Sequence, residues 1–362
     1  MFLPKNPLFA LLLAAGLCGQ ALLAADSMQT IPANDSRFCY EGRFDLAAAA
    51  APAVIWQGSR IAIDFEGEQL ALRFDWSEGQ NFFDVTVDDA TEILAVNDAG
   101  HSRLEFPGKL GPGRHRLTIF KRTEAAAGHA RFRGIEIADG AHAWVPMPPA
   151  YKLKLLFIGD SITAGACNED GTDDQWENRA THNNARSYAA LTAAALQADY
   201  RNIAVSGMGI ALGWVEPLAG QIWDRVYPVV SSPKADLTEW IPDVVCVNFG
   251  ENDSSFSTAN NLEFPTAKYI DGYIALIEAV RAAHPEAHIV ILRGGMFGGA
   301  KDERLAKAWG AVVEKLEGDD AKVHHFIFDH WSTTHPRVSD TKAMSHELLR
   351  WLKRQEFMRA YE

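Results

Sequence analysis

Between about Phe38 and Trp144, apolar and polar residues alternate with a period of two. Alternation of this kind places every second side chain on one face of an extended strand, so it predicts strands with one buried face. The pattern is clearest in four segments, RIAIDFEG (60–67), QLALRFDW (69–76), FFDVTVDD (82–89) and RHRLTIFKR (114–122). Turn residues separate these segments, and the run 47–51 is interpreted as a loop or short turn. Several short strands at this spacing predict a β-sandwich.

The proline-rich segment WVPMPPAY (144–151) marks a change of pattern. Beyond it, continuous apolar runs are followed by helical patterns, as in a parallel sheet covered by helices on both faces. The expected strands are KLLFIG (154–159), NIAVSG (202–207), VVCVNF (244–249) and AHIVILRGG (287–295). The expected helices include SYAALTAAALQA (187–198), YIDGYIALIEAVRAAH (269–284) and a last helix over 342–359. The chain is therefore expected to combine a β-sandwich over 26–148 with an α/β domain over 149–362.

Residues 1–25 have the composition of an export signal. Lys5 supplies a positive charge, 9–23 form an apolar run interrupted by glycines and a glutamine, and Ala24 and Ala25 offer a cleavage point. The alternative is an uncleaved membrane anchor, but the run is shorter than the roughly 20 residues that span a bilayer. We therefore expect a secreted or periplasmic protein with no membrane association once the signal is removed.

The overall charge excludes one class of partner. With a formal net charge of -13, the chain would repel nucleic acid, whereas neutral or cationic substrates are compatible with its field. Three cysteines remain after cleavage, Cys39, Cys167 and Cys246, so at least one thiol stays free, and the apolar surroundings of Cys246 indicate a core position. The histidines lack cysteines or carboxylates at zinc-ligand spacing, so no metal or other cofactor is expected.

Chemically useful side chains occur where the expected parallel strands end, which is where ligands bind in open α/β sheets. Ser161 follows KLLFIG in the sequence GDSIT, at a strand-to-helix turn. Its hydroxyl can attack an acyl carbon while its backbone N–H stabilises the oxyanion, or it can simply be a helix N-cap. Asn252, in GEND, can donate its side-chain amide to the same oxyanion, or can bond its own backbone in a turn.

Two further positions complete this set. Gly207 ends NIAVSG, where the missing side chain lets a backbone N–H approach a substrate oxygen; the alternative is an ordinary turn glycine. His335 precedes Pro336, which disfavours helical backbone at the histidine and keeps its ring on a loop near the sheet edge. A histidine there can serve as the general base of Ser161, although an isolated histidine is more often structural.

A serine, a glycine, an asparagine and a histidine in this order, at GDSIT, Ser206-Gly207, GEND and the His-Pro dipeptide, resemble the SGNH (GDSL-like) hydrolase superfamily. The resemblance implies a flavodoxin-like α/β/α domain in which Ser161 is the nucleophile and His335 is the general base. It also implies an oxyanion hole formed by the backbone amides of Ser161 and Gly207 and by the side chain of Asn252, without a metal ion.

The amino-terminal motifs extend the resemblance over nearly the whole chain beyond the signal. WQGS (56–59), FEG (65–67), LGPGRH (110–115), KRTE (121–124) and Gly134 are similar to the jelly-roll domain of carbohydrate esterase family two, and SYAALTA, SGMGI and WIPDVVCVNFGEND also match that family. The resemblance implies an exported acetylesterase that removes O-acetyl groups, often from the sugar 6-hydroxyl, from plant polysaccharides such as xylan and glucomannan or from oligosaccharides. It specifies neither the polysaccharide nor the oligomeric state.

One position departs from the superfamily pattern, in which an aspartate three residues before the histidine orients the imidazole. Ser332 occupies that position here, and Asp329 can replace the aspartate only if its loop folds back. Some members of family two resemble this chain in using a serine–histidine dyad. We therefore expect a backbone carbonyl within residues 331–333 to accept the Nδ1 proton of His335.

Two other functions remain open. A lipase or thioesterase of the same superfamily would prefer longer acyl chains, and a carbohydrate-binding protein with weak or absent catalysis would account for the missing aspartate. Aromatic side chains near the site can stack on sugar rings, although each also suits a core or loop position; the candidates are Trp176, Trp214, Trp223 and Trp331. The acidic stretch 169–177 is expected to be a solvated loop beside the cleft, with substrate contact as the alternative.

Overall fold

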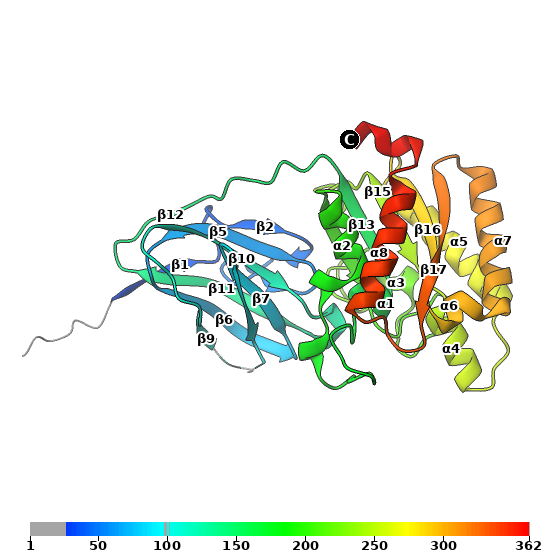
Figure 1. The fold of residues 1–362 in the computed structure, drawn as a ribbon, viewed down its shortest axis with the longest axis horizontal. Helices are drawn as coiled ribbons and strands as arrows, with labels where there is room; N and C mark the ends of the chain where they lie inside the picture. The colour runs from blue at the N-terminus through cyan, green and yellow to red at the C-terminus, as the bar shows by residue number, and fades with distance from the viewer. Residues whose placement is uncertain (1–26, 98–99, 101, 362) are drawn as a thin grey trace, which may run out of the picture.

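The computed structural model describes residues 27–97, 100 and 102–361, so the predicted signal segment 1–25 lies outside the described residues. Two regions lie side by side (Figure 1), an antiparallel β-sandwich and a parallel sheet flanked by helices. Residues 145–153, which have no regular structure, run along one side of the molecule and connect the two regions. The predicted fold class of a sandwich followed by an α/β region is therefore confirmed.

Two antiparallel sheets form the sandwich, and the four strands expected from alternation are all present in them. One sheet contains β3 (Phe44–Asp45), β4 (Ala53–Val54), β11 (Gly128–Ala138), β6 (Leu70–Gly79) and β9 (Ser102–Glu105), in this order, with β1 (Met28–Pro32) beside β11. The other contains β12 (Ala143–Trp144), β5 (Arg60–Glu66), β10 (Arg114–Lys121), β7 (Phe82–Val87) and β8 (Ala90–Ala95), with β2 (Cys39–Glu41) beside β5. The long strand β11 lacks a clean sequence signal because its pairing with β6 shifts register between Phe132 and Gly134.

Apolar side chains on the facing surfaces of the two sheets form the sandwich core. Every second residue of β7 is buried, as the alternation predicts. Phe132 of β11 is fully buried, and the centroid of its ring lies 5.3 Å from that of Phe38 and 5.5 Å from that of Phe74. Aromatic pairs at this separation add to the hydrophobic gain from burying the rings, so Phe132 is a central residue of this core.

Five parallel strands form the second sheet. Their spatial order is β14 (Asp199–Ala204), β13 (Lys154–Gly159), β15 (Val244–Asn248), β16 (His288–Met296) and β17 (Val323–Ser332). This is the strand order 2-1-3-4-5 of flavodoxin-like folds, as the resemblance implies. The first four of these strands match the apolar runs in the sequence, whereas β17 does not. Only Val323 and Phe328 are buried in this edge strand, so its sequence carries no continuous apolar run.

Helices cover both faces of the parallel sheet. The helices on one face are α2 (Tyr188–Ala195) and α8 (Val338–Leu352), and those on the other face include α3 (Ala219–Ile222), α5 (Thr266–Ala283) and α7 (Glu303–Asp319). The shorter elements are α1 (Ser161–Ala164), α4 (Glu251–Ala259), α6 (Phe297–Lys301) and the 3-10 helices η1 (Ala125–Ala127), η2 (Arg179–Thr181), η3 (Asn184–Arg186) and η4 (Glu356–Tyr361). Helix α8 begins at Val338 rather than at Lys342, because the Asp340 carboxylate accepts the Arg337 N–H at 2.8 Å and caps the helix there.

The sandwich and the α/β region share part of one hydrophobic core. Ile55 and Trp56 of the sandwich belong to the same buried cluster as Ile203 and Val205, which lie at the carboxyl end of β14 and just beyond it. The indole Nε1 of Trp56 also donates to the carbonyl oxygen of Val226 at 2.7 Å. The two regions are therefore packed together by apolar and polar contacts and are not merely joined by residues 145–153.

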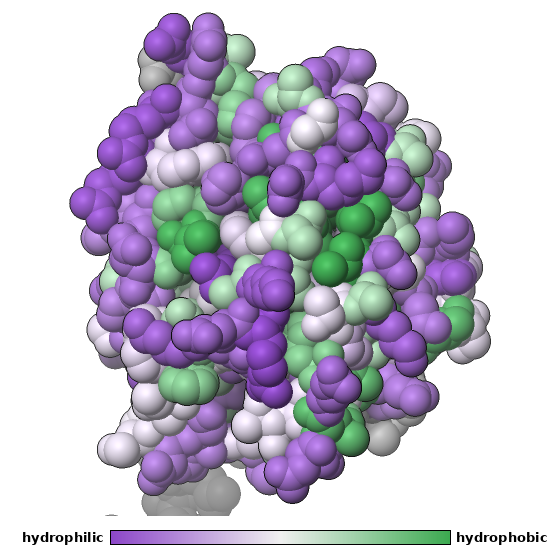
Figure 2. Space-filling model, turned by 90° about the vertical axis from the view of Figure 1, so that its right-hand side faces the viewer, coloured by the Kyte–Doolittle hydropathy of each residue, from purple (hydrophilic) through white to green (hydrophobic). Residues whose placement is uncertain are grey.

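The remaining predictions concern membrane association and the state of the cysteines. Among the described residues, no helix has the length and apolar character that a membrane span requires. The end of the α/β region away from the sandwich is mainly hydrophilic, with hydrophobic residues in small separate groups (Figure 2). The three cysteines that the structure describes are unpaired, and Cys246 is buried within β15, as its apolar surroundings predict.

Replacing Phe132 by alanine should lower the free energy of unfolding by about 3–5 kcal/mol, because the change removes a buried ring and leaves a cavity. Urea denaturation followed by circular dichroism measures this loss. The matched control is Ile93→Ala on β8, where the side chain is 54% exposed and the cost should stay below about 0.5 kcal/mol. Equal destabilisation by the two substitutions would contradict the assigned core.

Candidate active site

Three of the four predicted site residues follow neighbouring strands at the carboxyl edge of the parallel sheet. Ser161 begins α1 shortly after β13, Gly207 lies just beyond β14, and Asn252 is in the first turn of α4, after β15. Because β13 lies between β14 and β15, the serine is flanked by the elements that carry the other two residues. His335 follows β17 at the same edge of the sheet. All four residues are thus on loops or helix ends where α/β proteins bind ligands.

Ser161 is the first residue of α1 and not its N-cap. Asp160 caps this helix, because its Oδ1 accepts the Ile162 N–H at 3.0 Å. The interpretation of Ser161 as an N-cap is therefore wrong. Its backbone N–H belongs to the first turn of the helix, where N–H groups have no partner within the helix. Although the serine is only 4% exposed, its position at the strand-to-helix turn makes it a candidate nucleophile with an oxyanion donor of its own.

The side-chain amide of Asn252 lies between the segments that carry the serine and the glycine. Its Nδ2 donates to the Asp160 side chain at 3.2 Å and to the carbonyl oxygen of Met208 at 3.0 Å. Neither partner is in its own turn, which argues against an asparagine that only bonds its local backbone. Burial, with Glu251 and Asp253 nearby, raises the pKa of Asp160 well above its usual value. The contact to Asp160 is the longer of the two, so this amide N–H can be transferred to a stronger acceptor.

Gly207 has a backbone conformation that other residues adopt only with strain. Its φ is +80°, and a Cβ at this position would lie 3.1 Å from Cγ1 of Val215 and 3.2 Å from Cβ of Trp214. The buried carboxylate of Asp253 fixes the loop beyond it by accepting the N–H groups of residues 210, 211 and 212 at 3.0, 2.7 and 2.9 Å. The backbone around Gly207 is therefore rigid, as an oxyanion donor requires.

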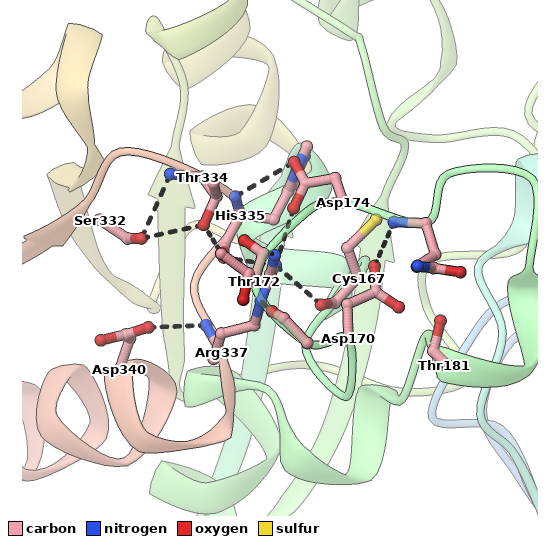
Figure 3. A network of polar contacts seen from close by, with 12 residues as sticks. Cys167, Asp170, Thr172, Asp174, Thr181, Ser332, Thr334, His335, Arg337 and Asp340 are labelled. Carbon is pink, nitrogen blue, oxygen red and sulfur yellow. Dashed lines mark hydrogen bonds and ion pairs between the residues drawn. The ribbon is translucent and has the colours of Figure 1, made fainter.

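His335 pairs with an acidic residue from a distant part of the chain (Figure 3). Its Nδ1 lies 2.7 Å from Oδ2 of Asp174. The prediction that a backbone carbonyl within 331–333 holds the ring is therefore wrong, and so is the alternative that uses Asp329. Asp329 is an exposed residue of the edge strand β17 and bonds Glu347 through its backbone N–H. Because the carboxylate occupies Nδ1, the neutral imidazole keeps its proton there and leaves Nε2 free to act as a base.

Arg337 holds the Asp174 carboxylate from the other side. Its Nη1 donates to Oδ1 of Asp174 at 2.7 Å, and the guanidinium also donates to backbone carbonyls within residues 167–172. Burial alone would raise the pKa of Asp174, but the hydrogen bonds from His335 and Arg337 outweigh this effect and hold the pKa well below its usual value. The aspartate therefore stays ionised whenever the histidine is able to act as a base.

The acidic stretch 169–177 contributes to the site through Asp174, so its description as only a solvated loop is incomplete. In the same stretch, the ring of Trp176 lies 5.2 Å from the ring of His335, at an interplanar angle of 34°. The contact between Asp174 and His335 joins positions 161 residues apart, which no local spacing can indicate. The available sequence signals were the concentration of acidic residues in 169–177 and the arginine directly after the His-Pro dipeptide.

One group of side chains near the site has metal-ligating atoms. Cys167, Asp174 and His335 each place such an atom within 4.8 Å of the others. The group fits a metal ion poorly. Burial raises the pKa of the Cys167 thiol, which disfavours the thiolate that metals bind, and Arg337 already pairs with the aspartate. The arrangement of Asp174 and His335 is better suited to acid–base chemistry.

Aromatic side chains and a groove lie beside the candidate site. Of the four tryptophans considered above, Trp223 is buried in the core, whereas Trp214 is 52% exposed. A groove of about 690 Å³ borders the first turn of α4. Phe297 lines it with a side chain that is 57% exposed, and its ring centroid lies 6.0 Å from that of Trp331. Most of the other lining residues are charged or carry hydroxyl groups; they include Glu251, Ser254, Ser255, Thr258, Lys301, Asp302 and Thr333.

The strand order of the parallel sheet and the residues at its carboxyl edge define the class of GDSL-like (SGNH) hydrolases. Comparison with known families agrees with this class. Residues 157–346, more than half of the chain, match the GDSL-like Lipase/Acylhydrolase family, and residues 40–148 match the Carbohydrate esterase 2 N-terminal family. The chain therefore belongs to carbohydrate esterase family two, within the GDSL-like hydrolases.

Individual relatives share both regions. The chain is 34% identical over 341 residues to the Cellulase/esterase CelE of Acetivibrio thermocellus, a match that covers 91% of this chain and 41% of that protein. It is 28% identical over 371 residues to an Acetylxylan esterase / glucomannan deacetylase of Cellvibrio japonicus, with coverage of 95% and 97%. A solved family two carbohydrate esterase from Clostridium thermocellum, in complex with cellohexaose, has a TM-score of 0.79 and 30% identity, over 87% of this chain and 98% of that one. The chain thus spans less than half the length of CelE.

Gly207→Ala should lower both stability and esterase activity, because an alanine at this φ is strained and its Cβ would press on Val215. We expect a loss of about 1–2 kcal/mol in the free energy of unfolding and at least about a tenfold loss in kcat. Denaturation and hydrolysis of 4-nitrophenyl acetate measure the two effects. Gly220→Ala is the matched control, since its Cβ would meet nothing within 4 Å, and it should leave both quantities near their original values. Unchanged kcat in Gly207→Ala would remove this residue from the site.

Proposed function

We propose that the protein is a carbohydrate acetylesterase that hydrolyses O-acetyl groups of plant polysaccharides or oligosaccharides through a Ser161–His335–Asp174 triad. The observation that carries the proposal is the pairing of His335 with Asp174 at the sheet edge where Ser161, Gly207 and Asn252 also lie. A serine flanked by oxyanion donors and a histidine held by a carboxylate are the parts that acyl transfer requires.

His335 acts as the general base toward the hydroxyl of Ser161. Its Nε2 accepts the hydroxyl proton while the serine oxygen attacks the carbonyl carbon of the acetyl group. The imidazolium that forms lies 2.7 Å from the ionised carboxylate of Asp174, which stabilises the positive charge. This stabilisation is greater than a backbone carbonyl would provide, because the aspartate carries a full negative charge.

Three N–H donors stabilise the tetrahedral oxyanion. Two are the backbone amides of Ser161 and Gly207, and the third is Nδ2 of Asn252. In the free protein the contact between Nδ2 and Asp160, at 3.2 Å, is the longer of the two that this amide makes. As negative charge develops on the oxyanion, the oxyanion takes over this N–H from Asp160. Each such donor lowers the barrier by roughly 3 kcal/mol.

Collapse of the tetrahedral intermediate releases the sugar hydroxyl, which receives the proton from the imidazolium of His335. The acetyl group is then bound to Ser161 as an ester. A water molecule gives its proton to the same Nε2 and attacks the acetyl-enzyme, and acetate leaves after a second tetrahedral intermediate. The same donors stabilise both intermediates, so a single arrangement serves both half-reactions.

The groove beside α4 supports a sugar as the larger part of the substrate. Hydroxyl and charged side chains line most of it, and Phe297 offers an exposed ring on which a sugar can stack. The similarity to an acetylxylan esterase / glucomannan deacetylase of Cellvibrio japonicus supports acetylated xylan and glucomannan as candidate substrates. The composition of residues 1–25 supports export, to the periplasm or beyond the cell.

The carbohydrate-binding alternative loses its main support in the structure. It depended on the absence of an acid at the position of Ser332, which left the histidine without a charged partner. Asp174 supplies that partner from another loop, so nothing in the arrangement of the site requires catalysis to be weak. We therefore retain sugar binding as a part of substrate recognition and not as a separate function.

Acetate release from acetylated xylan and acetylated glucomannan tests the proposal directly. We expect the unsubstituted protein to release acetate and Ser161→Ala and His335→Ala to lower kcat by at least about 10⁴-fold, since each change removes a reacting group. Release by Ser161→Ala at the original rate would overturn the assignment. A preference for long-chain 4-nitrophenyl esters over the acetate ester would favour the lipase alternative instead.

Asp174→Asn should lower kcat by about 10²–10⁴-fold, because an amide favours the wrong imidazole tautomer and cannot neutralise the imidazolium. The low pKa of Asp174 means that the aspartate stays ionised throughout the pH range of the assay, so the substitution removes a full negative charge beside the imidazole.

The control for this substitution is Asp173→Asn, which changes the adjacent exposed acid and should leave kcat unaltered. Both variants are compared with 4-nitrophenyl acetate over the full range of pH at which the protein stays folded. An unchanged kcat in Asp174→Asn would mean that the enzyme works as a serine–histidine dyad, and the aspartate would be removed from the mechanism.

A further inference from the structure

Two sandwich motifs have no role in the mechanism above, WQGS (56–59) and KRTE (121–124). Both lie where the sandwich meets the α/β region. Glu124, the last residue of the second motif, is only 2% exposed, and its side chain reaches across the junction. Burying a carboxylate costs free energy unless hydrogen-bond donors contact its oxygens. The groups that donate to Glu124 therefore indicate which segments this residue holds in place.

One oxygen of Glu124 binds the backbone next to the oxyanion hole. Its Oε2 accepts the N–H of Ser206 at 2.8 Å, and both groups are buried. Ser206 directly precedes Gly207, so this bond fixes the peptide unit between Val205 and Ser206, which is next to the one that carries the N–H of Gly207. Hydrogen bonds from a backbone N–H to a carboxylate are among the stronger ones in proteins. The sandwich therefore determines the position of one of the proposed oxyanion donors.

The other oxygen of Glu124 is linked to the general base. Its Oε1 accepts from Nη1 of Arg179 at 3.3 Å. The guanidinium of Arg179 lies over the ring of Trp176, 4.6 Å from its centroid, and the imidazole of His335 also packs against that ring, at 5.2 Å. Cation–π and ring–ring contacts of this kind restrict the orientation of each partner. Glu124 thus binds the segment beside the oxyanion hole directly and is linked to the general base through Arg179 and Trp176.

Neighbouring residues of the two motifs reinforce the same junction. Nε2 of Gln57 donates at 2.9 Å to the carbonyl oxygen of Ala204, the last residue of β14. Arg122 is almost completely buried, forms an ion pair with Glu169 and donates to the carbonyl oxygen of Ala180 at 2.9 Å. These bonds hold the strand end and both sides of the loop that carries the acid of the triad.

We propose that Glu124 is a positioning residue, supplied by the sandwich, that sets the oxyanion hole and the general base of the hydrolase region at the same time. The proposal rests on the proposed function, because it requires Gly207 and His335 to act as described there. The sandwich is then a component of the active site and not only a neighbouring or carbohydrate-binding domain.

Loss of the Glu124 carboxylate should act on catalysis more than on substrate binding. Without it the N–H of Ser206 has no acceptor, and the donor at Gly207 is free to shift away from the position that the oxyanion occupies. A displacement of about 1 Å in a catalytic group costs on the order of 100-fold in rate. Since the oxyanion exists only in the transition state and the intermediates, the loss should appear in kcat with little change in KM.

The experiment compares Glu124→Gln and Glu124→Ala with the unsubstituted protein. Glu124→Gln keeps the shape of the side chain but turns an amide toward either Ser206 or Arg179, both of which are donors. The matched control is Glu136→Gln, which neutralises a sandwich carboxylate whose ion pairs, with Arg73 and Arg103, are both within the sandwich. Rates with 4-nitrophenyl acetate are expressed per active serine, after titration with a covalent phosphonate, so that misfolded protein does not contribute.

Inhibition by phenylboronic acid provides a second measurement that a purely structural role would not change. Its tetrahedral serine adduct places an oxygen in the oxyanion hole, as the reaction intermediate does. We expect kcat to fall about tenfold in Glu124→Gln and about 100-fold in Glu124→Ala, with KM within about threefold. The inhibition constant of phenylboronic acid should rise by a comparable factor in each variant, whereas Glu136→Gln should match the unsubstituted protein.

Two outcomes would overturn the inference. One is a kcat within twofold of the original in Glu124→Gln; this isosteric variant decides the question even if Glu124→Ala does not fold. The other is a lowered kcat with unchanged inhibition by phenylboronic acid. Failure of the proposed function is recognised separately, because Ser161→Ala would then retain activity. A Ser161→Ala variant that is inactive beside a fully active Glu124→Gln would leave the esterase standing and remove only the role of Glu124.

Discussion

Three carboxylates are buried at the carboxyl edge of the parallel sheet, and each must be satisfied by donors. Glu124 accepts the N–H of Ser206, Asp160 accepts that of Ile162, and Asp253 accepts three consecutive N–H groups of the loop after Gly207. A buried carboxyl group that loses its donors is destabilising, so these loops cannot relax without a cost in free energy. Hydrogen bonding to buried acids, in addition to apolar packing, therefore fixes the backbone around the candidate nucleophile.

The acid that pairs with His335 comes from a different part of the sequence than the superfamily pattern predicts. The superfamily pattern places this acid three residues before the histidine, whereas here it comes from the loop after the first helix of the domain. The chemistry requires only that a carboxylate reach Nδ1 at hydrogen-bond distance. Arg337 makes this possible by binding both the carboxylate and the carbonyls of the irregular loop that carries it. The acid on this loop is thus held in place by the arginine directly after the His-Pro dipeptide.

The sequence predicted those features that depend on the local pattern of apolar and polar residues. Alternation predicted β5, β6, β7 and β10, and continuous apolar runs predicted the central parallel strands, so the ends of β13, β14 and β15 identified Ser161, Gly207 and Asn252 as candidates. The buried positions of the edge strand β17 are not consecutive, and the pairing of β11 with β6 shifts register, so neither strand was predicted from its pattern. Asp174 was not found because its partner is 161 residues away and both residues lie in segments without regular secondary structure. Contacts of this kind depend on tertiary packing, which spacing along the chain does not encode.

The shared core restricts how the two regions can be exchanged between genes. Residues 145–153 have the appearance of a linker, at which recombination between domains would be expected to be harmless. Yet Ile55 and Trp56 complete the packing around Ile203 and Val205, and a chain divided at the linker would leave those surfaces without their counterparts. The unit that can be moved intact between genes is therefore the sandwich together with the hydrolase region. A match that covers 91% of this chain within only 41% of CelE is what the transfer of such a unit would produce.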